Sequence, residues 1–220
     1  GAESHIDLAS KVNTQGAINI AKATSHFGAS LIQISTDYVF NGDFSKPITE
    51  HQVQSPMNNY GLTKANAEIL LEKEFKSSVV VLRTAWLYGK HGPNFIKTML
   101  NLEKIKETIS VVDDQIGQPT WTKDLVSQII TMVESQVPAG TYHGTSSGQT
   151  SWFGLTQRIY ESIEADPKRV LPTTTDAFPR PAPRPAYSVL GHEKWTAVGM
   201  PPIRNWDEAL QAAFDDGVFK

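Results

Sequence analysis

Two short apolar segments on either side of a helical segment constrain the fold of this chain more than any other feature. Residues 30–35 predict a short buried strand, and residues 78–83 are apolar on both faces, which is typical of a strand buried on both sides of a parallel sheet. Helical periodicity covers residues 60–75 between them, and also residues 8–27, where it ends at Gly28. Strands that alternate with helices predict an α/β fold with a Rossmann-type, doubly wound parallel sheet.

The second half of the chain is less regular and predicts a mixed α+β part. The expected elements are helices at 94–102, 123–135 and 152–163, strands at 109–112 and 141–143, and a final amphipathic helix that begins at Trp206. Six prolines between residues 166 and 185 predict a stretch without regular structure. Residues 41–59, rich in Gly, Pro, Asn and Ser, predict a long loop of the kind that often carries function.

Composition narrows the classes of function. The chain has 40% apolar and 20% charged residues and a net charge of -3 with no basic block, so we expect no nucleic-acid partner and no anionic membrane surface. No apolar run reaches the roughly 18 residues of a membrane span. The absence of cysteine excludes disulfides and thiolate metal sites, and a cytoplasmic location is expected. The six histidines lack metal-ligand spacing, so no metal site is predicted.

A tyrosine and a lysine four residues apart form the first candidate site. Tyr60 and Lys64 share one face at the start of the predicted helix 60–75. An ammonium next to a phenol is expected to lower the phenol pKa from its ordinary value of about 10, which suits general acid catalysis. The spacing alone is common, but Ser35 and Thr36 end a strand at the sheet edge where open α/β folds bind ligands.

Four separated motifs give the chain a resemblance to a known family. They are Ser35-Thr36-Asp37-Tyr38-Val39-Phe40, Tyr60-x-x-x-Lys64, the run from Leu82 to Gly89, and the run from Val112 to Thr120. In this order they resemble the dTDP-4-dehydrorhamnose reductases, which are extended short-chain dehydrogenase/reductases acting on nucleotide sugars. The resemblance implies that residues 1–88 are the C-terminal part of a dinucleotide-binding Rossmann domain. Residues 89–220 would be mainly a substrate-binding lobe, with some segments returning to the first domain.

The resemblance also implies roles for individual residues. Tyr60 would protonate the 4-keto oxygen of a dTDP-sugar while a nicotinamide delivers hydride, and Thr36 would hydrogen-bond the same oxygen. Lys64 would hold the nicotinamide ribose. The remaining implied contacts are Ser35 and Thr84 to the cofactor, and Asp37, Trp86 and Gln115 to the substrate. For Trp86, packing at a strand end is as good an interpretation as a platform for the sugar.

Other members of the superfamily fit less well. Related dehydratases carry Thr-Asp-Glu where this chain has Thr36-Asp37-Tyr38, and Tyr38 cannot replace the carboxylate that eliminates water. Epimerases lack the Asp-Tyr-Val-Phe run. The regulatory β subunit of methionine adenosyltransferase, which resembles these reductases, supplies a non-enzymatic alternative. The presence of Thr36, Tyr60 and Lys64 together favours the reductase.

The cofactor site is expected to be incomplete. The family opens with a Gly-rich turn that binds the cofactor pyrophosphate, and no Gly-x-x-Gly-x-x-Gly precedes Val12. We therefore expect two or more βα units to be missing, and negligible cofactor binding by the 220 residues alone. NADPH and NADH both remain open as hydride donor. Some relatives form a homodimer with Mg²⁺ at the interface, but its ligands are not identifiable here.

A few polar residues have weaker assignments. Asp113 and Asp114 follow the strand 109–112 and are expected to end it rather than to bind a cation. Gln118 and Thr120 are candidates, with Gln115, for the lining of the nucleotide pocket. Arg180 and Arg184, between prolines, suit either a diphosphate or a solvated surface.

Overall fold

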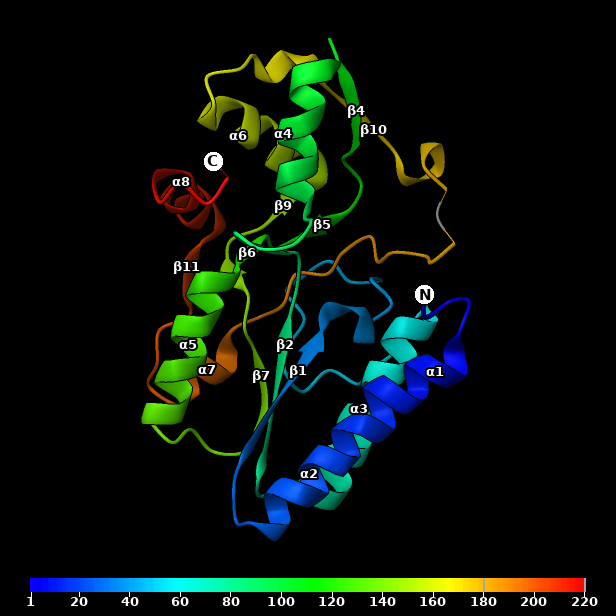
Figure 1. Cartoon of the computed structure of the whole chain (residues 1–220), viewed down its shortest axis with the longest axis vertical. Coiled ribbons are helices and arrows are strands. Elements are labelled where there is room, and N and C mark those ends of the chain that lie inside the picture. Colours follow the sequence, from blue (N-terminus) through cyan, green and yellow to red (C-terminus); the bar gives the residue numbers. More distant parts are fainter. Residues whose placement is uncertain (180, 220) are drawn as a thin grey trace.

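A three-stranded parallel sheet lies at the centre of the part of the chain that carries the site (Figure 1). The computed structural model describes residues 1–179 and 181–219. The sheet contains β1 (Leu31–Thr36), β2 (Val79–Thr84) and β7 (Gly140–His143) in the order β1-β2-β7, all parallel. All six residues of β2 are buried because it is the central strand, which confirms the expectation from its apolar sequence. The expected burial is wrong for much of β1, where Ile34 is 38% exposed, because β1 is an edge strand of this sheet.

Helices cover both faces of this sheet, so the predicted α/β, doubly wound arrangement is confirmed (Figure 1). One face packs against α2 (Gly16–His26) and α3 (Asn59–Phe75), with Ala21 and Leu71 in the shared core. The other face packs against α5 (Thr122–Glu134) and α7 (Glu193–Ala197). The predicted first helix is divided into α1 (Ile6–Ser10), the π-helical turn η1 (Lys11–Gln15) and α2. It ends at His26, and the chain turns at Gly28, which has a φ of 66°.

The remaining elements form a second layered region, seen in the upper half of Figure 1. Its core contains buried residues of α4 (Phe95–Ile105), α6 (Trp152–Ser162) and α8 (Trp206–Asp215). The short strands and 3-10 turns that follow β2 are β3 (Leu87–Tyr88), β4 (Ile109–Val112), β5 (Ile116–Gly117), β6 (Thr120–Trp121), β8 (Ser146–Ser147), β9 (Thr150–Ser151), β10 (Val170–Thr173), β11 (Ile203–Asn205), η3 (Pro167–Arg169) and η4 (Thr175–Ala177). The 3-10 turn η2 (Asp37–Val39) directly follows β1.

The expectation that prolines exclude regular structure between residues 166 and 185 is wrong in part. Strand β10 contains Pro172 and pairs in parallel with β4, where Pro172 lies opposite Val111. The pair forms a sheet of only two strands. An edge strand tolerates proline because its outer side needs no amide donor.

The proline-rich segment crosses back toward the sheet (Figure 1). Residues 183–187, called the strap below, are held at both ends: Asn58 Nδ2 donates to the Pro183 carbonyl at 2.9 Å, and the Tyr187 amide donates to the Gly42 carbonyl at 3.3 Å. Gly42 lies so close to Pro185 that an added Cβ would be 2.5 Å from the proline Cα. Across residues 1–179 and 181–219, no helix combines the length and apolar character that a membrane crossing requires.

Candidate active site

The candidate site lies at the carboxyl ends of β1 and β2. In the parallel register Thr36 is paired with Thr84, and Ser35 with Arg83. Parallel strands end at the same edge of a sheet, and this edge is where α/β folds bind ligands. Ser35, Thr36 and Thr84 are all buried there. Three of the residues predicted from sequence are therefore brought together by the strand register alone.

The N-terminus of α3 places Tyr60 at this edge. Asn58 caps the helix by accepting the Gly61 amide at 2.8 Å, and Glu3 Oε1 accepts the amides of Asn59 at 3.0 Å and Tyr60 at 3.3 Å. These acceptors satisfy amides that a helix N-terminus otherwise leaves unpaired. Gly61 allows close approach to the turn after β1, because an added Cβ would lie 2.0 Å from the Tyr38 carbonyl oxygen.

The side chains of Thr36, Asp37 and Tyr60 form one group. Thr36 Oγ1 donates to Asp37 Oδ1 at 3.0 Å and accepts the Tyr38 amide at 3.3 Å. Tyr60 is 39% exposed; the burial of the rest of the residue raises its pKa, the Thr36 side chain opposes that rise, and the charge of Asp37 adds to it. The expectation that Lys64 lowers the pKa of this phenol is therefore wrong. Its physical reason is that burial penalises the tyrosinate more than the neighbouring groups stabilise it.

Lys64 extends from the next turn of α3 toward β1. Its Nζ donates to the Ile34 carbonyl at 2.6 Å. Burial lowers the pKa of the Lys64 ammonium, and the charge of Glu68 opposes this change. Tyr60 and Lys64 thus share one helix face, as their spacing predicted, while the ammonium is anchored to the strand that ends at Thr36.

Asp37 is a buried carboxylate with one unused oxygen. The residue is 2% exposed, and its Oδ2 has no partner within the described residues. Burial raises its pKa from 3.8 to about 6, and the side chains of Ser188 and Thr36 oppose that rise. Ser35 Oγ and Thr84 Oγ1 are likewise buried without a partner among those residues. Buried polar atoms are normally paired, so unpaired ones at one sheet edge mark a place for a polar ligand.

Trp86 and Gln115 belong to a second group, joined by Trp152. Trp86 has a left-handed backbone with a φ of 46° and stacks on Trp152, with ring centroids 3.5 Å apart and planes at 6°. Trp152 Nε1 donates to Gln115 Oε1 at 3.2 Å, and Gln115 Nε2 donates to Thr175 Oγ1 at 2.9 Å. Of the two interpretations of Trp86, packing at a strand end is seen in the structure, as the stack on Trp152. Its role as a platform for the sugar stays a prediction. A left-handed non-glycine residue stores backbone strain, which is common at functional sites.

Sequence reasoning missed Trp152 and misplaced two other residues. Trp152 begins α6 directly after the capping residue Ser151, but only its position against Trp86 shows its role. Gln118 and Thr120 do not line an open pocket, so that interpretation was wrong. Gln118 is 2% exposed and its amide pairs with both backbone groups of Leu190. Thr120 is fully buried, donates to the Gln118 carbonyl and accepts the Ser146 amide.

The structure places three of the remaining four weaker candidates, Asp113, Asp114 and Arg184. Asp113 and Asp114 follow β4, as expected, and accept hydrogen bonds from Ser151 Oγ and from Thr175 respectively. Arg184 is exposed on the strap, and its charge opposes the rise that burial causes in the pKa of Tyr38. Arg180 lies outside the described residues. Among those residues, no three or more carboxylate or imidazole side chains gather in a way that could hold a metal ion.

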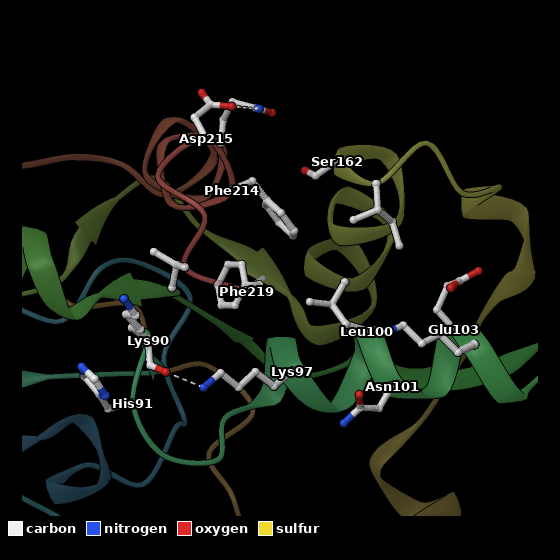
Figure 2. A pocket seen from close by; sticks show the side chains of 14 residues that line it. Lys90, His91, Lys97, Leu100, Asn101, Glu103, Ser162, Phe214, Asp215 and Phe219 are labelled. Atoms are coloured by element: carbon white, nitrogen blue, oxygen red, sulfur yellow. Dashed lines mark hydrogen bonds between the residues drawn. The ribbon is translucent and has the colours of Figure 1, made fainter.

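A separate cleft of about 1010 Å³ is lined by α4, α6 and α8 (Figure 2). Lys90, His91 and Lys97 lie at one end, and Lys97 Nζ donates to the Lys90 carbonyl at 2.6 Å. Phe214 and Phe219 form apolar walls. Neither Thr36 nor any residue of α3 lines this cleft, so it is distinct from the candidate active site.

Comparison with known proteins assigns the chain to a family. The family model described as the RmlD substrate binding domain matches residues 1–218. A dTDP-4-keto-6-deoxy-D-glucose reductase of Streptomyces niveus is 43% identical over 213 residues, which cover 97% of this chain and 74% of that protein. A dTDP-4-dehydrorhamnose reductase of Streptomyces griseus is 43% identical over 217 residues, with coverages of 97% and 71%.

The fold is shared with solved structures. The crystal structure of dTDP-4-dehydrorhamnose reductase from Bacillus anthracis in complex with NADP matches with a TM-score of 0.92 and 40% identity. The match covers 98% of this chain and 75% of that one. The chain thus spans about three quarters of the length of these relatives. On its sequence and its fold, the chain belongs to the dTDP-4-dehydrorhamnose reductase family.

Proposed function

We propose that this chain carries the proton-transfer site of an enzyme that reduces dTDP-4-dehydro-L-rhamnose to dTDP-L-rhamnose with NADPH. The observation that carries the proposal is the group of Thr36, Asp37 and Tyr60 at the sheet edge, with Lys64 one helical turn away. The names of the relatives support the substrate class, since they are reductases of dTDP-linked 4-keto sugars. The relatives differ in the sugar that they name, and the 4-keto group is what they share.

Tyr60 is suited to donate a proton to the oxygen of the 4-keto group. Because burial raises its pKa, the phenol holds its proton at neutral pH and releases it only to a strongly basic oxygen. Thr36 donates its hydroxyl to Asp37 Oδ1, and this hydroxyl can turn to the same substrate oxygen as negative charge develops there. The unused Oδ2 of Asp37 can accept a hydrogen bond from a sugar hydroxyl.

Part of the chain fits the nicotinamide end of the cofactor. The buried, unpartnered hydroxyls of Ser35 and Thr84 and the ammonium of Lys64 suit the hydroxyl and amide groups of a nicotinamide riboside. When bound, NADPH would supply the hydride that reduces the carbonyl carbon. NADP in the Bacillus anthracis relative supports the choice of NADPH over NADH. This chain has no Gly-x-x-Gly-x-x-Gly sequence for the pyrophosphate, and the relatives that it matches are longer.

The two parts of the chain, residues 1–88 and 89–220, have different roles in this proposal. Residues 1–88 hold the proton-transfer group, and residues 89–220 supply most of the contacts to the sugar nucleotide, including those of Trp86's partner Trp152 and of Gln115. We further propose a cytoplasmic homodimer, which rests on the resemblance to the family alone. Sedimentation equilibrium on the purified protein tests the dimer.

Replacement of Tyr60 by Phe tests the assigned proton donor. Turnover of the keto-sugar, followed by nicotinamide absorbance in the protein that contains this chain, should fall about 10²- to 10⁴-fold. Tyr160→Phe is the matched control, because the Tyr160 hydroxyl is buried in α6 without a partner in the described residues and its removal should leave turnover unchanged. Near wild-type turnover of the Tyr60→Phe variant would refute the role. Copurification with a catalytic partner, together with no turnover of any keto-sugar by the wild type, would favour the regulatory-subunit alternative.

A further inference from the structure

Three polar residues of α3 lie on one face at consecutive turns. Tyr60, Lys64 and Glu68 are four residues apart, which places them in a row along the helix. Lys64 reaches β1 through the Ile34 carbonyl, and Glu68 reaches β2 through a salt bridge to Arg83, with Nη2 and Oε2 2.7 Å apart. Successive turns of the helix are thus fastened to two adjacent strands, immediately behind the turn that carries Tyr60.

The salt bridge between Glu68 and Arg83 is buried and fixed from several sides. The two residues are 2% and 1% exposed, and Arg83 Nε also donates to both carboxylate oxygens of Glu68, at 3.2 and 3.1 Å. Gln54 Nε2 donates to Glu68 Oε2 at 2.9 Å, and Arg83 Nη1 donates to the Glu50 carbonyl at 3.3 Å. Apolar residues of similar volume often stabilise a core as well as a buried ion pair does. The pair therefore calls for a role other than stability.

The other ionisable groups near the salt bridge do not replace Glu68 as the negative charge opposite Arg83. Burial and the charge of Arg83 lower the pKa of His143 well below its ordinary value, so this histidine of β7 is neutral. Its Nδ1 lies 2.8 Å from the Gly191 carbonyl and can donate to it, which leaves Nε2 to accept from Arg83 Nη1 at 3.3 Å. The Glu50 carboxylate accepts the Lys194 amide at 3.0 Å. Glu68 thus supplies the negative charge opposite Arg83.

The same carboxylate also acts on Lys64. Burial disfavours the Lys64 ammonium, and Glu68 opposes that effect. Toward the start of the helix lie Tyr60, Asp37 and Tyr38, and Glu3 contacts the first amides of α3. Among the charges around Lys64, that of Glu68 raises the pKa of its ammonium. Without Glu68, the partly buried ammonium would lose the anion that opposes the effect of its burial.

We propose that Glu68 is a positioning residue for the reduction: clamped by Arg83, it fixes the turn of α3 that carries Lys64 against β1 and β2 and provides the anion one turn from the Lys64 ammonium. Glu68 itself touches neither the sugar nor the nicotinamide in this proposal. The link to reduction rests on the proposed function. The effect on Lys64 is a property of the folded chain and can be measured without turnover.

The direct test is the pH dependence of amine acetylation at Lys64. The folded protein is treated with trace acetic anhydride between pH 8 and 12, and the labelling of Lys64 relative to the exposed Lys22 of α2 is measured by mass spectrometry. Glu68→Gln should shift the half-maximal labelling of Lys64 to lower pH and raise its rate at pH 9 about fivefold, because only the neutral amine reacts. Glu72→Gln, an exposed site one turn further along, is the matched control and should leave the curve unchanged.

A second variant covers the case in which Glu68→Gln leaves Arg83 unpaired and the protein unfolds. The double variant Glu68→Leu, Arg83→Met removes both charges, and such apolar replacements usually preserve folding. The labelling curve of Lys64 should still shift, because the Glu68 carboxylate is the charge that supports that ammonium. A wild-type labelling curve in either folded variant would overturn the proposal, and would do so without bearing on the assignment of the reductase.

Turnover provides the readout that separates positioning from mere structure. In the folded variants, kcat for the keto-sugar should fall about tenfold while KM for the sugar stays within about twofold, and the alkaline limb of the pH profile should move to lower pH. A variant with a shifted labelling curve but wild-type kcat and pH profile would show that Glu68 serves the fold alone, and would overturn the positioning role. Absence of turnover in the wild type would instead contradict the proposed function.

Discussion

Replacement of Asp37 by Asn should change the pH dependence of stability by an amount that the structure sets. The carboxyl group is buried, one of its oxygens lacks a partner in the described part of the chain, and burial raises its pKa from 3.8 to about 6. Since the pKa in the folded state is above that in the unfolded state, the folded protein holds this proton more tightly. The corresponding stabilisation is complete below about pH 3.8 and is lost as the pH rises to about 6.

The magnitude follows from the difference between the two pKa values. A rise from 3.8 to about 6 corresponds to about 3 kcal/mol, of which about 2.5 kcal/mol is lost between pH 4 and pH 8. Asparagine has no proton to lose in this range, so the Asp37→Asn variant escapes that penalty. Relative to wild type, its free energy of unfolding should therefore increase by about 2.5 kcal/mol from pH 4 to pH 8.

Urea unfolding followed by tryptophan fluorescence measures this difference at a series of pH values, since the chain has five tryptophans. The relevant quantity is the change in the difference with pH, because the amide and the carboxylate also differ in their hydrogen bonds. Asp43→Asn, at an exposed site in the following loop, is the matched control and should give a nearly constant difference. A constant difference for Asp37→Asn as well would refute the claim that this carboxylate is desolvated.

Two further substitutions test the packing around the site. Gly61→Ala would place a methyl group 2.0 Å from the Tyr38 carbonyl oxygen, so the free energy of unfolding, measured by thermal unfolding, should fall by about 1–3 kcal/mol, and turnover should fall as Tyr60 moves. Gly16→Ala, which meets only an ordinary 3.6 Å contact in α2, is the control and should not destabilise the protein. Equal stability of the two variants would contradict this view. Trp152→Leu removes the ring that stacks on Trp86, so the free energy of unfolding should fall by about 2 kcal/mol and the near-ultraviolet circular dichroism of the stacked pair should disappear. An unchanged spectrum would show that the two rings do not stack in solution.

The sequence predicted the parts of the site that depend on local pattern. Thr36 ends an apolar strand and Tyr60 begins a helix with Lys64 on the same face, and these features follow from periodicity within 20 residues or so. The direction of the pKa change of Tyr60 did not follow, because burial depends on which segments cover the phenol. The stacking of Trp86 on Trp152 joins residues from distant parts of the chain, which no local pattern reveals.

The strand β10 shows the same limit for the fold. Its proline argued against regular structure, and only the partner strand β4, far earlier in the chain, makes the backbone of Val170–Thr173 extended. Glu68 is an intermediate case. Its spacing from Lys64 was visible in the sequence, but its importance depends on Arg83. Arg83 lies on β2, and its buried side chain reaches Glu68 of α3 only because of how the sheet packs against this helix. Local rules therefore place side chains on faces, and tertiary contacts decide their ionisation.

The strap has a consequence for the order of folding. Asn58, which caps the helix that carries Tyr60, donates to the Pro183 carbonyl 125 residues later, and the Glu50 carboxylate before that helix accepts the Lys194 amide 144 residues later. Contacts of such long sequence separation require closure of large loops and tend to form late. During synthesis, the contact between the capping residue Asn58 and the strap can therefore form only after Pro183 has emerged. In refolding, activity should therefore recover more slowly than secondary structure. Proteolytic cleavage near the strap should lower activity while most of the secondary structure remains.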